Sequence, residues 1–163
     1  MAIGLVGVIA LLGCGGGGGD DNGNGGGGGT TLGACGSPEG STTPVVCGAV
    51  KDDGGNPVQG VEVILRSSSG AELKRTTTLA NGTFKFNPAT NGTQLEVAPP
   101  STSYWPTMVS YGGAVYDYDL PNKAGTGKCY LATGVTSGDR YMGVIRIFSN
   151  ASPPPPPTGG CPR

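Results

Sequence analysis

The five cysteines are the residues of this 163-residue chain with the clearest chemical potential. The chain has no histidine, so a Ser-His-Asp triad, a Cys-His pair and histidine metal ligation are all excluded. No serine stands three residues before a lysine, so the S-x-x-K pattern of Ser-Lys nucleophiles is missing as well. We therefore expect no enzymatic activity, no cofactor and no metal site. The thiols are expected to accept lipid or to form disulfides.

Cys14 follows a short apolar run. Residues 2–12 are too few to span a bilayer as a helix, but they match the h-region of a signal peptide in length. The run ends in Leu11-Leu12-Gly13-Cys14, with a leucine three residues before the cysteine and a small residue directly before it. This tetrapeptide resembles the lipobox of bacterial lipoproteins. No Lys or Arg precedes the run, which differs from the usual signal peptide.

The lipobox resemblance implies that residues 1–13 are a signal peptide removed by cleavage after Gly13. Cys14 would then carry a diacylglyceryl group on its sulfur and a further acyl chain, such as palmitate, on its amine. Several acyl chains hold a protein stably on a membrane, since each buried CH₂ contributes about 0.8 kcal/mol. Because Gly15 rather than Asp follows the cysteine, the resemblance also implies an outer-membrane or cell-surface location.

Residues 14–34 are expected to be a lipid-anchored, Gly-rich tether. The tract offers almost no apolar area to offset the backbone entropy that glycine loses on folding, so we expect a random coil. About twenty such residues have an r.m.s. reach of roughly 25 Å. A phosphate-binding glycine loop is not expected, because such a loop needs a strand before it and a helix after it.

Residues 35–150 are predicted to form one domain. Short apolar runs alternate with turn signals at intervals typical of a sandwich or barrel, and Asn81-Gly82 is the strongest hairpin signal. The predicted fold class is all-β, a small Greek-key-type β-sandwich of about seven strands. Candidate strands lie at residues 45–50, 61–66, 73–78, 83–86, 95–97, 114–120, 129–132 and 142–148. A formal net charge of −1 with no basic block excludes nucleic-acid partners.

A pattern of glycines, valines and turn residues at characteristic positions covers residues 47–98. Its members are Gly48, Val50, Asp53, Asn56-Pro57, Gly60, Val61, Val63, the threonines at 76–78, Gly82, Phe84, Leu95 and Val97. The pattern resembles the carboxypeptidase regulatory-like family, also described as transthyretin-like or prealbumin-like. The resemblance implies a β-sandwich module, usually non-catalytic, that occurs beside peptidases, in surface adhesins and in outer-membrane receptors. Fold alone does not define function, and the residues after 98 are expected to add strands.

Four cysteines remain besides Cys14, and an even number in an exported protein indicates two disulfides. The favoured pairing joins Cys35 to Cys161 as a clamp on the ends of the domain, and Cys47 to Cys129 inside it. The alternative is Cys35–Cys47 with Cys129–Cys161. Each bond typically adds about 2–4 kcal/mol of stability.

Five aromatic residues crowd into one stretch of fifteen positions: Tyr104, Trp105, Tyr111, Tyr116 and Tyr118. Exposed Tyr and Trp side chains could form a binding surface for sugars or for a protein partner. The simpler alternative is that they belong to the core. Asp117 and Asp119 share one face of a candidate strand and are expected to be solvated.

Residues 151–163 are expected to be a Pro-rich C-terminal tail. The five prolines at 153–157 favour a stiff polyproline II rod of about 3.1 Å per residue. The tail is expected to be a spacer, a docking peptide or a segment that lies along the domain, held by Cys161. Related surface repeats cross-link a lysine to an asparagine, and Lys51 with Asn150 is one candidate pair for such an isopeptide bond.

The leading functional hypothesis is a non-enzymatic lipoprotein of the outer membrane or cell surface, with a structural or adhesive role. The alternatives are a carbohydrate- or peptide-binding surface lipoprotein that uses the region 104–118, and an accessory subunit of an outer-membrane assembly. The expected partners are the membrane, through the lipid anchor, and a glycan or an envelope protein.

Overall fold

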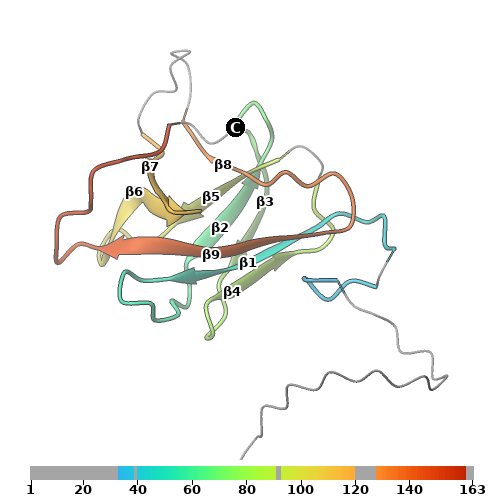
Figure 1. Cartoon of the computed structure of the whole chain (residues 1–163), viewed down its shortest axis with the longest axis horizontal. Helices are drawn as coiled ribbons and strands as arrows, with labels where there is room; N and C mark the ends of the chain where they lie inside the picture. Colours follow the sequence, from blue (N-terminus) through green and yellow to red (C-terminus); the bar gives the residue numbers. More distant parts are fainter. Residues whose placement is uncertain (1–32, 39, 91–92, 120–127, 161–163) are drawn as a thin grey trace, which may run out of the picture.

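The computed structural model describes residues 33–38, 40–90, 93–119 and 128–160, which form nine β-strands in two facing sheets (Figure 1). The strands are β1 (Val45–Lys51), β2 (Glu62–Arg66), β3 (Glu72–Thr77), β4 (Thr83–Phe86), β5 (Gln94–Ala98), β6 (Tyr104–Tyr111), β7 (Ala114–Asp117), β8 (Leu131–Ala132) and β9 (Asp139–Ser149). Within these ranges there is no helix long and apolar enough to cross a membrane. The predicted signal peptide and nearly all of the predicted tether lie outside the described residues.

The two sheets have the orders β4-β1-β9-β6-β7 and β3-β2-β5-β8. The first strand, β1, runs parallel to the last, β9, while the other neighbouring strands are antiparallel. The prediction of an all-β sandwich is confirmed, whereas the count of about seven strands was too low. The strand that sequence reasoning missed is β6, which contains Pro106. Proline argues against a central strand, and here the β6–β9 register shifts between Tyr104 and Val109, on either side of it.

The core lies between the sheets, and β2, β4 and β5 each supply it with alternate residues. Val63 and Leu65 of β2 and Leu95 and Val97 of β5 are completely buried. Phe84 and Phe86, predicted to share a core face of β4, are buried, and their rings meet edge to face with centroids 6.3 Å apart. The remaining core side chains come mainly from β1, β6 and β9. Tyr118, directly after β7, and Tyr130, directly before β8, also belong to the core.

The turn at Asn81-Gly82 is tight, but it does not pair β3 with β4. Gly82 has φ 76° and its N–H donates to Leu79 O at 2.8 Å, whereas Asn81 does not have the positive φ that the common Asn-Gly hairpin turn requires at both positions. However, Val50 N–H donates to Gly82 O at 2.8 Å, and this bond draws the chain onto β1 in the opposite sheet. As a result β3 and β4 are edge strands of different sheets, and they lie along the same open side of the sandwich.

Replacing Leu65 by Ala should lower the free energy of unfolding by about 2–5 kcal/mol, because the side chain is 0% exposed and its removal leaves a cavity. Leu73→Ala is the matched control, since Leu73 is 45% exposed on β3 and should change stability by no more than about 0.5 kcal/mol. Urea denaturation followed by circular dichroism measures both values. Equal losses for the two variants would contradict the assigned core.

Candidate functional site

The aromatic region predicted as a binding surface divides into buried and exposed parts. Tyr118 is only 1% exposed; its hydroxyl accepts Val97 N–H at 3.3 Å, and burial raises the pKa of its phenol. Its inclusion in a binding surface is therefore wrong, because an apolar core surrounds it. Tyr104, Tyr111 and Tyr116 are half-buried and pack against the same core.

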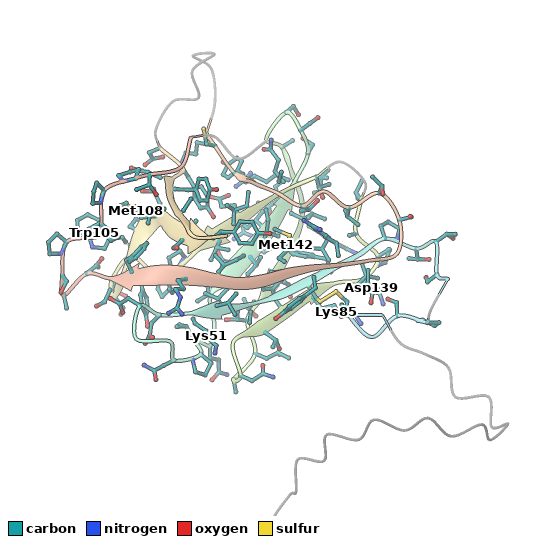
Figure 2. The ribbon with its side chains drawn as sticks, in the orientation of Figure 1. Lys51, Lys85, Trp105, Met108, Asp139 and Met142 are labelled. Carbon is teal, nitrogen blue, oxygen red and sulfur yellow. A yellow bond between two sulfur atoms is a disulfide. The ribbon has the colours of Figure 1, made fainter. Side chains whose placement is uncertain are left out.

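Trp105 is 38% exposed, and its indole N–H donates to Ser152 O at 3.1 Å. This bond ties Trp105 to the segment that follows β9. The tail therefore lies along the domain, which is one of the three arrangements expected from the sequence (Figure 2). Cys161, the residue expected to hold the tail, lies outside the described residues.

The disulfide pairing favoured from the sequence is wrong. Cys35 is bonded to Cys47, with a Cα–Cα distance of 5.7 Å and a sequence separation of 12. Residues 33–38, here called the N-terminal arm, fold back beside β1 and bring the two cysteines together, so Cys35 is not available to clamp the far end of the chain. This bond belongs to the alternative pairing. Cys129 is also disulfide-bonded, and the other half of that pairing, Cys129–Cys161, reaches outside the described residues.

The N-terminal arm is fastened by charge as well as by the disulfide. Oδ2 of Asp139, at the start of β9, accepts the N–H groups of Cys35 at 2.6 Å and Ser37 at 3.2 Å. Nζ of Lys85 donates to Cys35 O at 2.7 Å, and Figure 2 shows Lys85 and Asp139 near the disulfide. Hydrogen bonding by Ser37, and then by Cys35, holds the pKa of the Asp139 carboxyl below its usual range.

A groove of about 470 Å³ opens between the N-terminal arm and the turn that joins β3 to β4. Its volume lies within the range of about 300–1,000 Å³ that is typical of small-ligand sites. Leu79 and Tyr141 line it, although they are 63% and 51% exposed. The lining residues are Ala34, Cys35, Cys47, Gly48, Thr76, Thr77, Leu79, Thr83, Phe84, Lys85 and Tyr141.

The groove combines an apolar floor with a few polar groups. Phe84 and the Cys35–Cys47 bridge supply apolar surface, three threonines supply hydroxyls and Lys85 supplies one ammonium group. Gly48 makes room in the floor, because a Cβ there would lie 2.9 Å from Cζ of Phe84. Sequence reasoning missed this site. The sequence offered no sufficient signal, because a single exposed apolar residue such as Leu79 beside a turn is common on protein surfaces.

The acidic residues singled out from the sequence have structural partners. Asp119 forms an ion pair with Lys128 at 3.0 Å, and Oδ1 of Asp117 accepts the N–H of Asp119 at 3.0 Å. In the turn after β1, Asp52 also has a structural partner, since its carboxylate accepts the N–H of Asn56 at 2.8 Å. Across the described ranges, no three His, Cys, Asp or Glu side chains gather in a way that could hold a metal ion.

The candidate isopeptide pair is separated in the fold. Lys51 is opposite Arg146 in the β1–β9 ladder, and Asn150 lies four residues further along, at about 3.3 Å per residue. The side-chain amide of Asn150 donates to Ser101 O at 2.8 Å. A Lys51–Asn150 bond is therefore contradicted.

Comparison with known proteins gives local similarity only. No family model matches the chain. Serine-aspartate repeat-containing protein C from Staphylococcus aureus strains Newman and USA300 is 45% identical over 56 residues, which are 34% of this chain. The chain covers only 6% of the length of these curated relatives.

Two similar solved structures are both described as the major pilin subunit of Bacillus cereus, BcpA. One is a single-residue variant with a TM-score of 0.41 and 18% identity, covering 67% of this chain and 30% of the pilin chain. The other has a TM-score of 0.39 and 19% identity, covering 68% and 31%.

Asp139→Asn should weaken the fastening of the N-terminal arm in a pH-dependent way. A carboxyl whose pKa is lower in the folded state stabilises the fold above its unfolded pKa, near 3.8, and this contribution disappears as the pH falls through the folded pKa. Wild type should therefore exceed the variant in unfolding free energy at pH 7, and the difference should shrink below about pH 4. Asp53→Asn, at an exposed turn, is the control, and denaturation curves across pH measure all three. A difference between wild type and Asp139→Asn that does not vary with pH would exclude this role.

Proposed function

We propose that this chain is a non-enzymatic lipoprotein of the outer membrane or cell surface whose β-sandwich has a structural or adhesive role. The observation that carries the proposal is the attachment of the N-terminal arm, which joins the expected tether to the sandwich. The arm is held by the Cys35–Cys47 bond and by Asp139. Disulfides persist in exported proteins, and a tethered module needs its point of attachment held firmly to the fold.

The sequence match to a repeat-containing protein supports a modular role. The matched 56 residues are only 6% of the length of that protein, so the similarity is confined to one short segment of a much longer chain. A unit of this kind suits a structural or adhesive role better than a self-contained enzyme. The resemblance over residues 47–98 to the carboxypeptidase regulatory-like family, which spans β1 to β5, supports the same proposal.

The disulfides and the lipid anchor constrain one another. Three of the five cysteines are disulfide-bonded in the described residues, and two of these three pair with each other. If the sulfur of Cys14 carries the diacylglyceryl group, Cys161 is the only cysteine of the chain left for Cys129. We therefore propose lipid on Cys14 together with a Cys129–Cys161 bond.

Cys14→Ala should abolish labelling by radioactive palmitate and move the protein from the membrane to the soluble fraction, because no acyl acceptor is left. Non-reducing peptide mapping of the mature wild type should show a Cys129–Cys161 peptide and a lipid-bearing N-terminus at Cys14. Cys47→Ala is the control that should remain palmitoylated. Labelling of the Cys14→Ala variant, or a Cys14–Cys129 peptide in wild type, would rule out the anchor.

The groove favours a second candidate function, the binding of a glycan or an extended peptide. The specific observation is the exposure of Leu79 and Tyr141 beside hydroxyl and ammonium donors. Sugar rings pack their apolar faces on aromatic side chains while their hydroxyls bond to polar neighbours. A protein of the envelope, including a subunit of an outer-membrane assembly, could use the same groove.

Tyr141→Ala and Leu79→Ser should each weaken binding of a ligand found on a glycan array or in a cross-linked membrane extract by about tenfold, which corresponds to about 1.4 kcal/mol. Leu73→Ser is the matched control, because Leu73 is exposed but does not line the groove. Titration calorimetry with the purified ligand measures each affinity. Unchanged affinity in both groove variants would place the ligand elsewhere.

A further inference from the structure

The outer side of the central strands β1 and β9 is open, whereas two outward residues nearer the margins of the same sheet are covered. Val45 and Met108 each precede a core residue in their strand, so both point away from the core. They are nevertheless only 1% and 7% exposed. Between them, on β9, Tyr141 and Val144 are 51% and 39% exposed.

A glycine bulge in β9 puts Tyr141 and Val144 on the same outer side. The β1–β9 register shifts between Cys47 and Ala49, where β9 contains one residue more than β1. Gly143 lies in this stretch with φ 75°, and a Cβ on it would meet nothing within 4 Å. The surface between the two exposed side chains is therefore unfilled. Bulges of this kind re-aim side chains and are frequent beside functional sites.

Two cations lie opposite each other on this side of the sheet. Lys51 and Arg146 each follow a core residue in their strand, so both point outward. They are partners in the β1–β9 ladder, on strands about 4.8 Å apart. Like charges in directly opposed positions repel and destabilise a sheet. The four outward residues are here called the outer platform: Lys51, Tyr141, Val144 and Arg146.

The platform cations have no partner within the protein. In the part of the chain that the structure describes, neither the Lys51 nor the Arg146 side chain forms an ion pair or a hydrogen bond. The arginines of the opposite sheet differ in this respect. Arg66 is paired with Glu96, and Arg75 is paired with two glutamates at 2.7 and 2.8 Å. The unpaired positive charge is thus specific to the platform.

The carboxylates around the same sheet are bound by the chain's own backbone. Those of Asp52 and Asp53, directly after β1, accept main-chain N–H groups within their turn at 2.8 and 3.1 Å. Asp117 of β7 accepts the N–H two residues further on at 3.0 Å, and Asp139 holds the N-terminal arm. Among the described residues, none of the four forms an ion pair with a platform cation. The fold therefore keeps a repelling pair without an anion beside it.

The platform sets the chemistry of a matching ligand. Lysine and arginine only donate hydrogen bonds, so the ligand must supply acceptors and negative charge, and the guanidinium fork suits a carboxylate. The ring of Tyr141 offers a flat apolar surface with a polar tip. Along β1, the rungs that face Tyr141 and Arg146 are four residues apart, which is roughly 13 Å. This length suits a chain of sugar rings rather than a single small anion.

The outer platform is continuous with the groove. Tyr141 belongs to both, and Cys47 lies between Tyr141 and Lys85 in the sheet. Lys85 adds a third cation, and its ammonium has donors to spare beyond the one that binds Cys35 O. Figure 2 shows Lys85 and Lys51 well separated along β4 and β1, so positive charge is spread along the site.

We propose that the outer platform and the groove together bind a glycan chain that carries carboxylate groups, as a polyuronate does. A sugar ring stacks on Tyr141, and carboxylates of the chain bind Lys51 and Arg146. The repulsion between the two cations is relieved when the anion arrives. This inference rests on the binding role proposed for the groove and names the class of its ligand.

The test compares two forms of one glycan by titration calorimetry with the full chain. A short oligogalacturonate should bind at least about tenfold more tightly than its fully methyl-esterified form, which keeps the rings and loses the charges. Lys51→Gln and Arg146→Gln should each weaken binding of the acid form by about tenfold, and added salt should weaken it in wild type. Lys74→Gln is the matched control, because it removes an exposed lysine of β3 in the opposite sheet and should leave the affinity unchanged.

Thermal unfolding without ligand separates binding from folding. Because Lys51 and Arg146 repel each other, neither glutamine variant should unfold at a lower temperature than wild type. Lower unfolding temperatures in both variants would show that these side chains stabilise the fold, and the binding role would be overturned.

Three results of the titrations overturn the inference. They are equal affinity for the acid and the ester, unchanged affinity in both glutamine variants, and binding of dextran sulfate as tight as that of the galacturonate, which would mean unselective attraction of anions. The role proposed for the groove is judged separately. It survives any of these results if Tyr141→Ala and Leu79→Ser still weaken binding of a ligand found on the glycan array or in the membrane extract.

Discussion

The pairing of β1 with β9 is the interaction on which the rest of the structure depends. It joins the first and last strands of the domain in parallel, from Val45 opposite Asp139 to Lys51 opposite Arg146. β1 also carries β4, and β9 also carries β6, so the whole five-stranded sheet is assembled around this pair. Because the two strands are so distant in sequence, their pairing carries a large loop-closure entropy, which makes it slow to form.

The same pair organises the two segments that flank the domain. The N-terminal arm is fastened to β1 through Cys47 and to the first residue of β9 through Asp139. Residues 152–160, the C-terminal strap, leave the other end of β9 and close the β7 edge. Arm and strap therefore cover opposite ends of one sheet. Between the arm and the β3–β4 turn the surface stays open, and that opening is the groove lined by Leu79 and Tyr141.

Much of the fold could be predicted from the sequence because alternation and turn chemistry are local. Phe84 and Phe86 share a face by strand geometry alone, and the glycine at 82 has the positive φ that its turn needs. Which sheet a strand joins is not local. Val50 N–H bonding to Gly82 O places β4 beside β1, and no property of Asn81-Gly82 indicates this.

The Cys35–Cys47 pairing and the groove depend on the folded path of the arm, so spacing could not decide between the disulfide patterns. Exposed Tyr141 lies on the outer face of β9, where only the three-dimensional placement of the arm turns it into part of a site.

The parallel arrangement of β1 and β9 also has a mechanical consequence. The chain enters the pair at Val45, beside the first residue of β9, and leaves it after Arg146, at the opposite end of the ladder. Tension applied between the arm and the end of β9 is therefore directed along both strands. The rungs of the ladder are loaded together in shear, whereas a pull on an edge strand such as β3 or β4 opens its ladder one rung at a time. The Cys35–Cys47 bond carries this tension past the looped residues between the two cysteines and into β1 itself.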